Sequence, residues 1–332
     1  MGCAALMISG LGLLSTTSWP LIYAFRIVSG FGLMMFLLTA GMAVLAMAPE
    51  HRSSAIGYFV AAASTGALVA YGTGPFIYSA GAGIHGNFIA MVVFGALGAV
   101  TILPVKLTIA KTSAKLPPGI FVKVFKNPLI LIAGLVMIIL YGAAATFAGL
   151  CATFAIQPFV GLPIADLGYI FIPNCIGAII AGSTASTVLK KLGAKVAIIL
   201  YTALSLLTFI ITAFVSSFGH TGAIIALFGL FAFSDCFTIG TFPFFASEIL
   251  KRVPREVTMT STLVMQTFQS AGQVLLPLIG GSILGIAGIT YAGYQITWFS
   301  LAGIIAIGLV LDIIFVALLR RYKITETVEQ KQ

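Results

Sequence analysis

Long apolar stretches alternate with short polar gaps along the whole chain. A membrane-spanning helix needs about 20 predominantly apolar residues. Ten stretches fit or approach that length: 2–18, 20–47, 53–79, 86–105, 128–156, 165–189, 195–217, 221–250, 257–284 and 291–318. The pattern therefore predicts an all-α integral membrane protein with ten spans.

The basic residues follow the same alternation. Of the 17 Lys and Arg residues, all but Arg26 lie in the five gaps 48–53, 105–127, 190–195, 251–256 and 319–332. The alternate gaps, near 15–20, 79–87, 157–166, 217–221 and 285–292, hold none. Because basic loops mark the cytoplasmic side, we expect a multi-pass protein of the cell membrane. With an even number of spans, both termini would be cytoplasmic.

Composition narrows the class of protein further. The chain is 60% hydrophobic and 8% charged, whereas a soluble domain carries about 25% charged residues. The net charge of +9 is spread over loops that set topology, so we expect a lipid bilayer as partner and no nucleic acid. The four cysteines lie in apolar segments without metal-binding spacing, and neither a metal nor a cofactor is expected.

The spacing of prolines indicates two related halves. Pro75 and Pro277 occupy similar places in the third and ninth spans, 202 residues apart, and such weak internal symmetry is typical of transporters. The long basic gap contains Pro117, Pro118 and Gly119, which predicts a linker. The expected organisation is a four-span bundle, a cytoplasmic linker, a six-span bundle and a cytoplasmic tail, over 1–105, 106–127, 128–318 and 319–332.

Arg26, Gly30 and Gly32 in the second predicted span and Gly74-Pro75 in the third form short motifs that resemble those of the major facilitator superfamily. Arg26-x-x-x-Gly30-x-Gly32 resembles a motif in the family's fourth span, whose Arg is implicated in proton coupling. Gly74-Pro75 resembles part of the drug:proton antiporter signature, but three of the signature's glycines are replaced, by Ala70, Tyr78 and Ser79. The ninth span holds the complementary part in Pro277, Gly280 and Gly281, and the segment 190–195 resembles a degraded loop motif.

The resemblance implies a fold and an activity. It implies twelve spans in two six-helix bundles, of which this chain supplies family spans 3 to 12, so two further spans would precede Met1. It also implies secondary active transport of a small solute by alternating access. The oligomeric state and the substrate do not follow from the motifs.

Of the few charges that fall inside predicted spans, Arg26 and Asp235 are the candidates for function. A charge at the bilayer centre costs about 2.5–3.5 kcal/mol on insertion scales, so such residues are usually functional. Asp235 lies near the middle of the span 221–250, with no basic residue within reach along its own helix. A carboxyl group away from water is disfavoured in its charged form, which suits reversible protonation. We expect Arg26 and Asp235 to face one cavity and couple transport to protons; pairing of Arg26 with a carboxylate in the preceding spans is the alternative for that residue.

Other polar residues and helix breakers complete the predicted site. Gln266, Gln269 and Gln273 share one helix face. With Asn174, beside Pro173, they could line a substrate cavity, although interhelical hydrogen bonding explains the glutamines equally well. Pro243, after Gly240, removes the hydrogen bond to the Ile239 carbonyl, and such a break beside an intramembrane acid is typical of a hinge or a binding site. Asp312, near the cytoplasmic end of the last span, is expected to reach the interface or Arg320, and Glu248, beside a basic loop, is expected to be solvated.

These observations rank the possible functions. Proton-coupled efflux of an apolar or amphiphilic compound is the leading hypothesis, because of the resemblance around Arg26 and Gly74-Pro75. Proton-coupled uptake of a sugar or another metabolite is the alternative that the glutamines would favour. A non-transporting membrane scaffold or receptor is a third possibility. An enzyme is not expected, because no His lies in the middle of a span to form part of a catalytic cluster.

Overall fold

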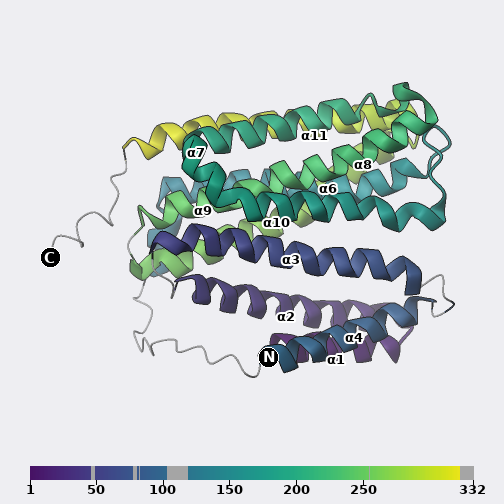
Figure 1. Cartoon of the computed structure of the whole chain (residues 1–332), viewed down its shortest axis with the longest axis horizontal. Coiled ribbons are helices and arrows are strands. Elements are labelled where there is room, and N and C mark those ends of the chain that lie inside the picture. The colour runs from purple at the N-terminus through teal and green to yellow at the C-terminus, as the bar shows by residue number, and fades with distance from the viewer. Residues whose placement is uncertain (46–48, 78–80, 82, 103–118, 254, 322–332) are drawn as a thin grey trace. The chain divides into compact units, whose positions relative to one another are not determined.

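The structure is a computed structural model that describes residues 1–45, 49–77, 81, 83–102, 119–253 and 255–321. Every regular element in these residues is helical (Figure 1). The first part of the chain forms α1 (Gly2–Leu14), α2 (Trp19–Leu45), α3 (Pro49–Ile77) and α4 (Gly83–Ile102). The remainder forms α5 (Ile120–Phe125), α6 (Pro128–Ala155), η2 (Ile164–Ile170), α7 (Phe171–Thr212), η3 (Val215–Phe218), α8 (Gly219–Thr238), η4 (Ile239–Thr241), α9 (Phe242–Leu250), α10 (Arg255–Ala287) and α11 (Tyr291–Leu319), where η marks 3-10 helices.

The predicted class, an all-α membrane protein, is confirmed. Five helical segments are long and apolar enough to cross a membrane: Pro128–Ala155, Gly168–Thr212, Val215–Leu250, Thr260–Ala287 and Tyr291–Leu319. Shorter apolar helices cover Gly2–Leu14, Ser54–Ala70 and His85–Thr101. The spans predicted from the hydrophobic pattern therefore coincide with helices throughout the described chain.

One helix contains two of the predicted spans. α7 has 42 residues, which would extend about 63 Å at about 1.5 Å per residue, twice the thickness of a bilayer core of about 30 Å. It turns back at Gly193, where φ is 73° and ψ is 154° (Figure 1). Only glycine adopts this left-handed φ without strain. The turn follows Lys190 and Lys191, so the predicted polar gap marks the place where α7 reverses.

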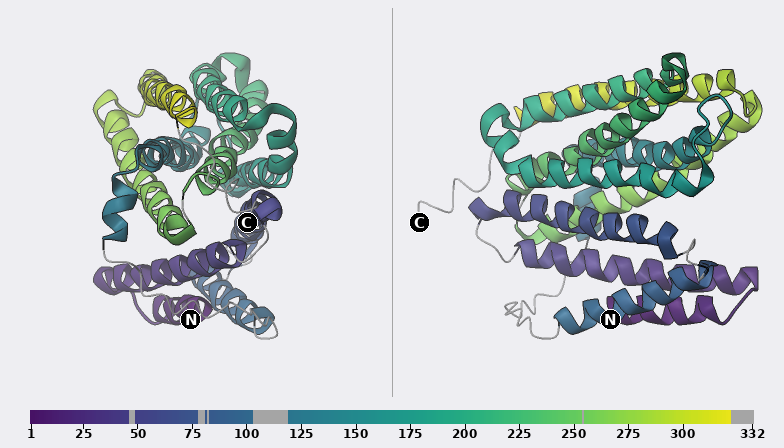
Figure 2. Two further views of the ribbon diagram at one scale, coloured as in Figure 1. Left: turned by 90° about the vertical axis from the view of Figure 1, so that its left-hand side faces the viewer. Right: turned by 45° about the vertical axis from the view of Figure 1, so that its right-hand side comes forward.

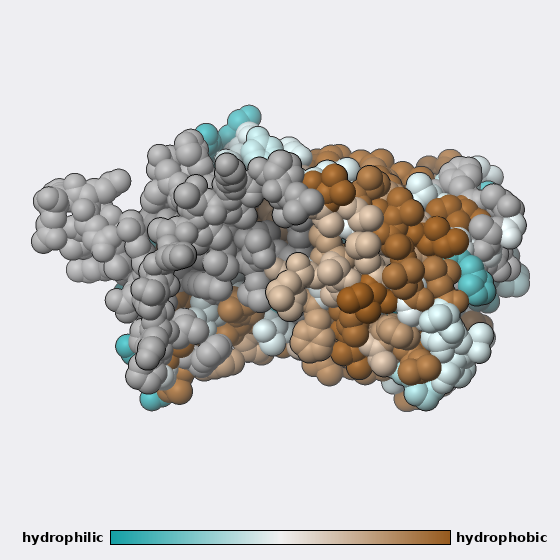
Figure 3. Space-filling model, turned by 90° about the horizontal axis from the view of Figure 1, so that it is seen from below, coloured by the Kyte–Doolittle hydropathy of each residue, from teal (hydrophilic) through white to brown (hydrophobic). Residues whose placement is uncertain are grey.

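The chain divides into two compact units, residues 1–48 with 72–115 and residues 49–71 with 116–332. In the first unit α1 packs against α2 and α4. Large apolar side chains of α1 and α4 are exposed, such as Ile8, Leu11, Val93 and Leu97. Figure 3 shows hydrophobic residues, in brown, over much of the coloured surface in that view. Such a surface suits lipid rather than water. The bundle boundaries predicted from the sequence remain predictions, and residues 106–118 and 322–332 lie outside the described chain.

In the second unit α6 is the central helix. It packs against α8, α9, α10 and α11, and the left view of Figure 2 shows it end-on with other helices around it. Glycines permit α6 and α10 to approach each other closely: a Cβ added at Gly142 would lie 2.6 Å from the Gly272 carbonyl oxygen of α10, and one at Gly272 would lie 2.2 Å from the Ile138 carbonyl oxygen of α6. A seam of small residues is how helices pack tightly in lipid, where burial of apolar surface supplies little driving force.

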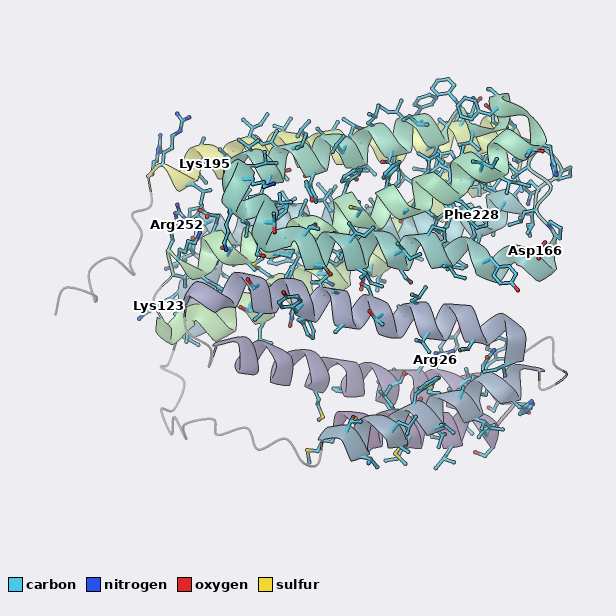
Figure 4. All side chains as sticks on the ribbon, in the orientation of Figure 1. Arg26, Lys123, Asp166, Lys195, Phe228 and Arg252 are labelled. Carbon is cyan, nitrogen blue, oxygen red and sulfur yellow. The ribbon has the colours of Figure 1, made fainter. Side chains whose placement is uncertain are left out.

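The two ends of the second unit differ in charge. Lys123, Lys195 and Arg252 lie at one end and Asp166 at the other (Figure 4). At the basic end Glu248 is buried and forms ion pairs with Lys251, at 3.0 Å, and with Arg252. The expectation that Glu248 is solvated is therefore wrong, because two basic side chains of the following turn fold back over it.

Candidate functional site

A group of polar side chains surrounds Asp235 inside the second unit. Asp235 on α8 is 8% exposed, Asn174 on α7 is 6% exposed and Tyr141 on α6 is 5% exposed. The Asn174 amide approaches the Asp235 carboxyl, and Tyr141 is also close enough to interact electrostatically with it. The Nδ2 atom of Asn174 nevertheless has no hydrogen-bond partner of normal geometry among the described residues. Three helices that are far apart in the sequence thus bring an acid, an amide and a phenol together.

The helix that carries Asp235 is interrupted just after it. α8 ends at Thr238, η4 covers Ile239–Thr241, and α9 begins at Phe242 with Pro243 in its first turn. Proline has no N–H to donate to the carbonyl of Ile239. That carbonyl instead accepts hydrogen bonds from the Phe242 N–H and, at 3.4 Å, from the Tyr141 hydroxyl.

Side-chain hydroxyls satisfy other carbonyls at this interruption. Thr241 Oγ1 donates to the Thr238 carbonyl at 2.7 Å, and Thr238 Oγ1 donates to the Ser234 carbonyl. Gly240 allows close packing, because a Cβ there would lie 2.9 Å from both Ala181 Cβ and Tyr201 Cε1. The interruption is therefore stabilised by its own hydroxyl groups, as irregular backbone inside a membrane requires.

The predicted glutamine face of α10 is only partly buried. Gln266 is buried, Gln269 is half-buried and Gln273 is exposed. Pro277 lies inside α10 without ending the helix. Beyond it, a Cβ at Gly280 would lie 2.6 Å from Thr146 Cγ2, whereas one at Gly281 would meet nothing within 4 Å. Their roles in a substrate cavity or a conformational motif remain predictions.

The predicted residues of the first half belong to the other unit. Arg26 is exposed on α2, and its carbonyl accepts a hydrogen bond from Ser29 Oγ at 2.8 Å. A Cβ at Gly30 would meet nothing within 4 Å, and one at Gly74 would lie 3.6 Å from Asn87 Oδ1. The side chain of Pro75 lies outside the described residues. The shared cavity of Arg26 and Asp235 stays a prediction.

Tyr141 is the site residue that the sequence reasoning missed. Its position offered one signal, since it falls near the middle of the apolar stretch 128–156, where a phenol hydroxyl needs a partner. Chemically, the arrangement supplies one ionisable group, an amide with hydrogen-bonding capacity to spare and a backbone interruption. Within the described residues, no three His, Cys, Asp or Glu side chains gather to hold a metal ion.

The fold is shared with solved transporter structures. The E. coli fucose:proton symporter FucP has a TM-score of 0.69 at 14% identity, covering 95% of this chain and 82% of that one. The human organic anion transporter MFSD10 (TETRAN) has a TM-score of 0.71 at 14% identity, covering 94% and 75%. A bacterial homologue of the iron transporter ferroportin, in its outward-facing state, has a TM-score of 0.63 at 16% identity, covering 95% and 82%.

Identities this low show a common fold and not a common substrate. The comparison with curated proteins finds no match. The family model described as Major Facilitator Superfamily matches residues 1–277, which is most of the chain. The chain therefore belongs to the Major Facilitator Superfamily and is a membrane transporter rather than an enzyme.

Proposed function

We propose that the protein is a proton-coupled secondary transporter in which Asp235 carries the proton. The observation that supports this most directly is the position of Asp235, buried beside Asn174 and Tyr141 and next to the interruption at η4. An intramembrane acid is costly unless neutralised or paired. Among the described residues Asp235 has no Lys or Arg in an ion pair with it, so proton uptake is the remaining way to remove its charge.

The interruption gives a physical route from proton binding to movement. Charge on Asp235 changes the electrostatics beside the Tyr141 hydroxyl, which holds the Ile239 carbonyl where α8 ends. Discontinuous helices near the membrane midplane form the substrate and ion sites of many transporters. Protonation would therefore bias η4 between two arrangements, and each would favour access from one side of the membrane.

Efflux of an apolar or amphiphilic compound is the direction that we propose first. It is supported by the antiporter-like motifs at Arg26 and at Gly74-Pro75. Uptake of a sugar or another polar metabolite is the second candidate. The cluster of Asn174 and Tyr141 favours it, because buried amide and hydroxyl groups recognise hydroxylated substrates.

Transport in reconstituted liposomes tests the proposal. A panel of amphiphilic compounds and sugars is offered with an imposed pH gradient, and solute movement is measured together with the internal pH. We expect one class of solute to move only with opposing or accompanying proton flux. In Asp235→Asn, accumulation driven by the pH gradient should disappear, while exchange of solute for solute across the membrane persists.

The matched control is Asp166→Asn. It makes the same chemical change at an exposed residue, at the end of the unit opposite Lys195 and Arg252. It should transport as the wild type does. Retention of full gradient-driven accumulation by Asp235→Asn would refute the role of Asp235 as proton carrier. Movement of sugars with protons, and not of amphiphiles against them, would replace efflux by uptake.

A further inference from the structure

A second acid is buried more deeply than Asp235. Asp312 on α11 has 0% of its surface exposed, and within the described chain neither carboxyl oxygen has a hydrogen-bond partner of normal geometry. The expectation that Asp312 reaches the membrane interface or Arg320 is wrong. Its position faces the inside of the helix packing, with the buried residues Gly308 and Phe315 one turn to either side of it.

Hydroxyl groups on α7 lie on the facing side. Thr202 is fully buried and its side chain approaches the Asp312 carboxyl. Neither Thr202 Oγ1 nor Ser205 Oγ, one turn further along, has a partner within the described residues. Other threonines of α7 behave differently: Thr208 and Thr212 donate to carbonyls four residues earlier, at 2.9 and 2.7 Å. Such bonds within the helix are the usual solution for a buried hydroxyl, so Thr202 is directed elsewhere, toward Asp312.

In the part of the chain that the structure describes, no cation compensates Asp312. The helices packed on α11 are α6, α7 and α10, and α9 contacts it through Phe245 and Phe315. Tyr141 of α6 donates to Ile239, and Tyr201 of α7 packs against aromatic rings of α8 and α9. The charged residues of these helices either form other ion pairs or are exposed at the basic end. Lys251 and Arg252 pair with Glu248. Four further basic residues are exposed: Lys190, Lys191, Lys195 and Arg320.

These surroundings of Asp312 and Thr202 are consistent with a protonated, neutral Asp312 carboxyl. An ionised carboxylate without a cation in such surroundings would be very costly, and two unpartnered acceptors beside one hydroxyl cannot both be satisfied. A neutral carboxyl has a proton to donate and the hydroxyl can accept it. We propose that Asp312 and Thr202 form a second proton-binding site, separate from Asp235, in which the Asp312 carboxyl donates to the Thr202 hydroxyl and holds α11 against α7.

The site does not depend on the proposed transport function. It shares no side chain with the group around Asp235, and proton loss here would place an uncompensated charge in the packing between two helices. At neutral pH the folded protein would then hold a proton that the unfolded chain has already released, because an aspartate in water loses its proton at about pH 4. Stability that depends on such a proton is present at low pH and is lost as the pH rises.

Infrared spectroscopy of the purified protein tests the proton directly. The wild type should show a carbonyl band of a protonated carboxylic acid at neutral pH, and Asp312→Asn should remove it. Spectra recorded in the Asp235→Asn background separate the two acids. Thr202→Val should shift the Asp312 band because it removes the acceptor, and Thr208→Val, the same change at a hydroxyl bonded within its own helix, should not.

Thermal unfolding in detergent supplies a second readout. The Tm of the wild type should fall from mildly acidic to alkaline pH, and the fall should be smaller in Asp312→Asn. If Asp312→Asn does not fold, the band shift in Thr202→Val still decides. An unchanged carboxylic acid band in both variants would overturn the proposal. Stabilisation of the wild type by Na⁺, absent in Asp312→Asn, would also overturn it by identifying a metal cation in place of the proton.

Discussion

Two buried acids of the same unit have different surroundings, and the difference separates their roles. Asp235 retains 8% of its surface and lies beside a helix interruption, whereas Asp312 is completely enclosed. A group that carries protons across a membrane must exchange them with water in each cycle. Asp235 therefore suits a carrier, and Asp312 suits a fixed proton that stabilises one helix pair.

The hydrogen bond from Tyr141 should matter more for transport than for stability. Tyr141→Phe keeps the ring against Phe242 but removes the side-chain donor to the Ile239 carbonyl, which then keeps only the bond from the Phe242 N–H. A typical hydrogen bond contributes about 0.5–1.5 kcal/mol to stability, so we expect a small loss of Tm and a clear loss of proton-driven transport. Both are measured on the same purified preparation.

Tyr294→Phe is the control for this change. Tyr294 donates to Thr153 Oγ1 at 3.1 Å, and it lies on α11, away from η4. The control should lose a similar amount of stability and keep its transport rate. Equal transport by both variants would mean that the Tyr141 hydroxyl only stabilises the fold.

Asp235 and Asn174 could be predicted as site residues from the sequence, because a charge and a proline are conspicuous in an apolar span. Tyr141 could not, since the role of that phenol depends on α6 lying beside η4, nearly 100 positions later in the chain. The sequence placed Asp312 near the end of a span and so predicted that it reaches the interface. It did not show that a neighbouring helix covers the face of α11 that carries Asp312. Partners across helices come only from packing.

At the scale of elements, the hydrophobic pattern predicted the helices well and the breaks unevenly. Pro243 and Pro277 both follow apolar runs, yet η4 precedes Pro243 while α10 continues through Pro277. Around Pro277, α10 is held against α6 through Gly272 and Gly280. The hydrophobic pattern does not distinguish the two prolines, although Pro243 lies in the first turn of α9 and Pro277 lies inside α10.

The seam between α6 and α10 yields a prediction for the second unit. In Gly272→Ala the added Cβ would lie 2.2 Å from the carbonyl oxygen of Ile138, and the backbone of α6 cannot move aside as a flexible side chain could. Overpacking typically costs about 1–3 kcal/mol, and we expect the upper part of that range or more. The measurement is the Tm in detergent, with the yield of monodisperse protein.

Gly281→Ala provides the comparison, because the new methyl group at that position of the same helix meets nothing within 4 Å. Alanine is the better helix former by up to about 1 kcal/mol, so its Tm should be unchanged or slightly higher. A loss of stability as large as that of Gly272→Ala would show that the seam is not what fixes α10 on α6.

At the scale of the molecule, the distribution of charge predicts how the chain lies in the membrane. In the second unit Lys123, Lys195 and Arg252 lie at one end and Asp166 at the other (Figure 4). The alternation of basic and non-basic gaps along the sequence therefore agrees with the separation of these residues to opposite ends of the unit. By the rule for basic loops, the lysine end is predicted to face the cytoplasm.

Chemical labelling in intact cells tests that orientation. Lys195→Cys and Asp166→Cys place single thiols at exposed residues of opposite ends, in a background where the native cysteines Cys3, Cys151, Cys175 and Cys236 are replaced by Ala and folding is verified first. A membrane-impermeant maleimide should modify Asp166→Cys in intact cells and Lys195→Cys only after permeabilisation. The opposite result would invert the topology, and proton entry to Asp235 would then have to be sought from the other side of the membrane.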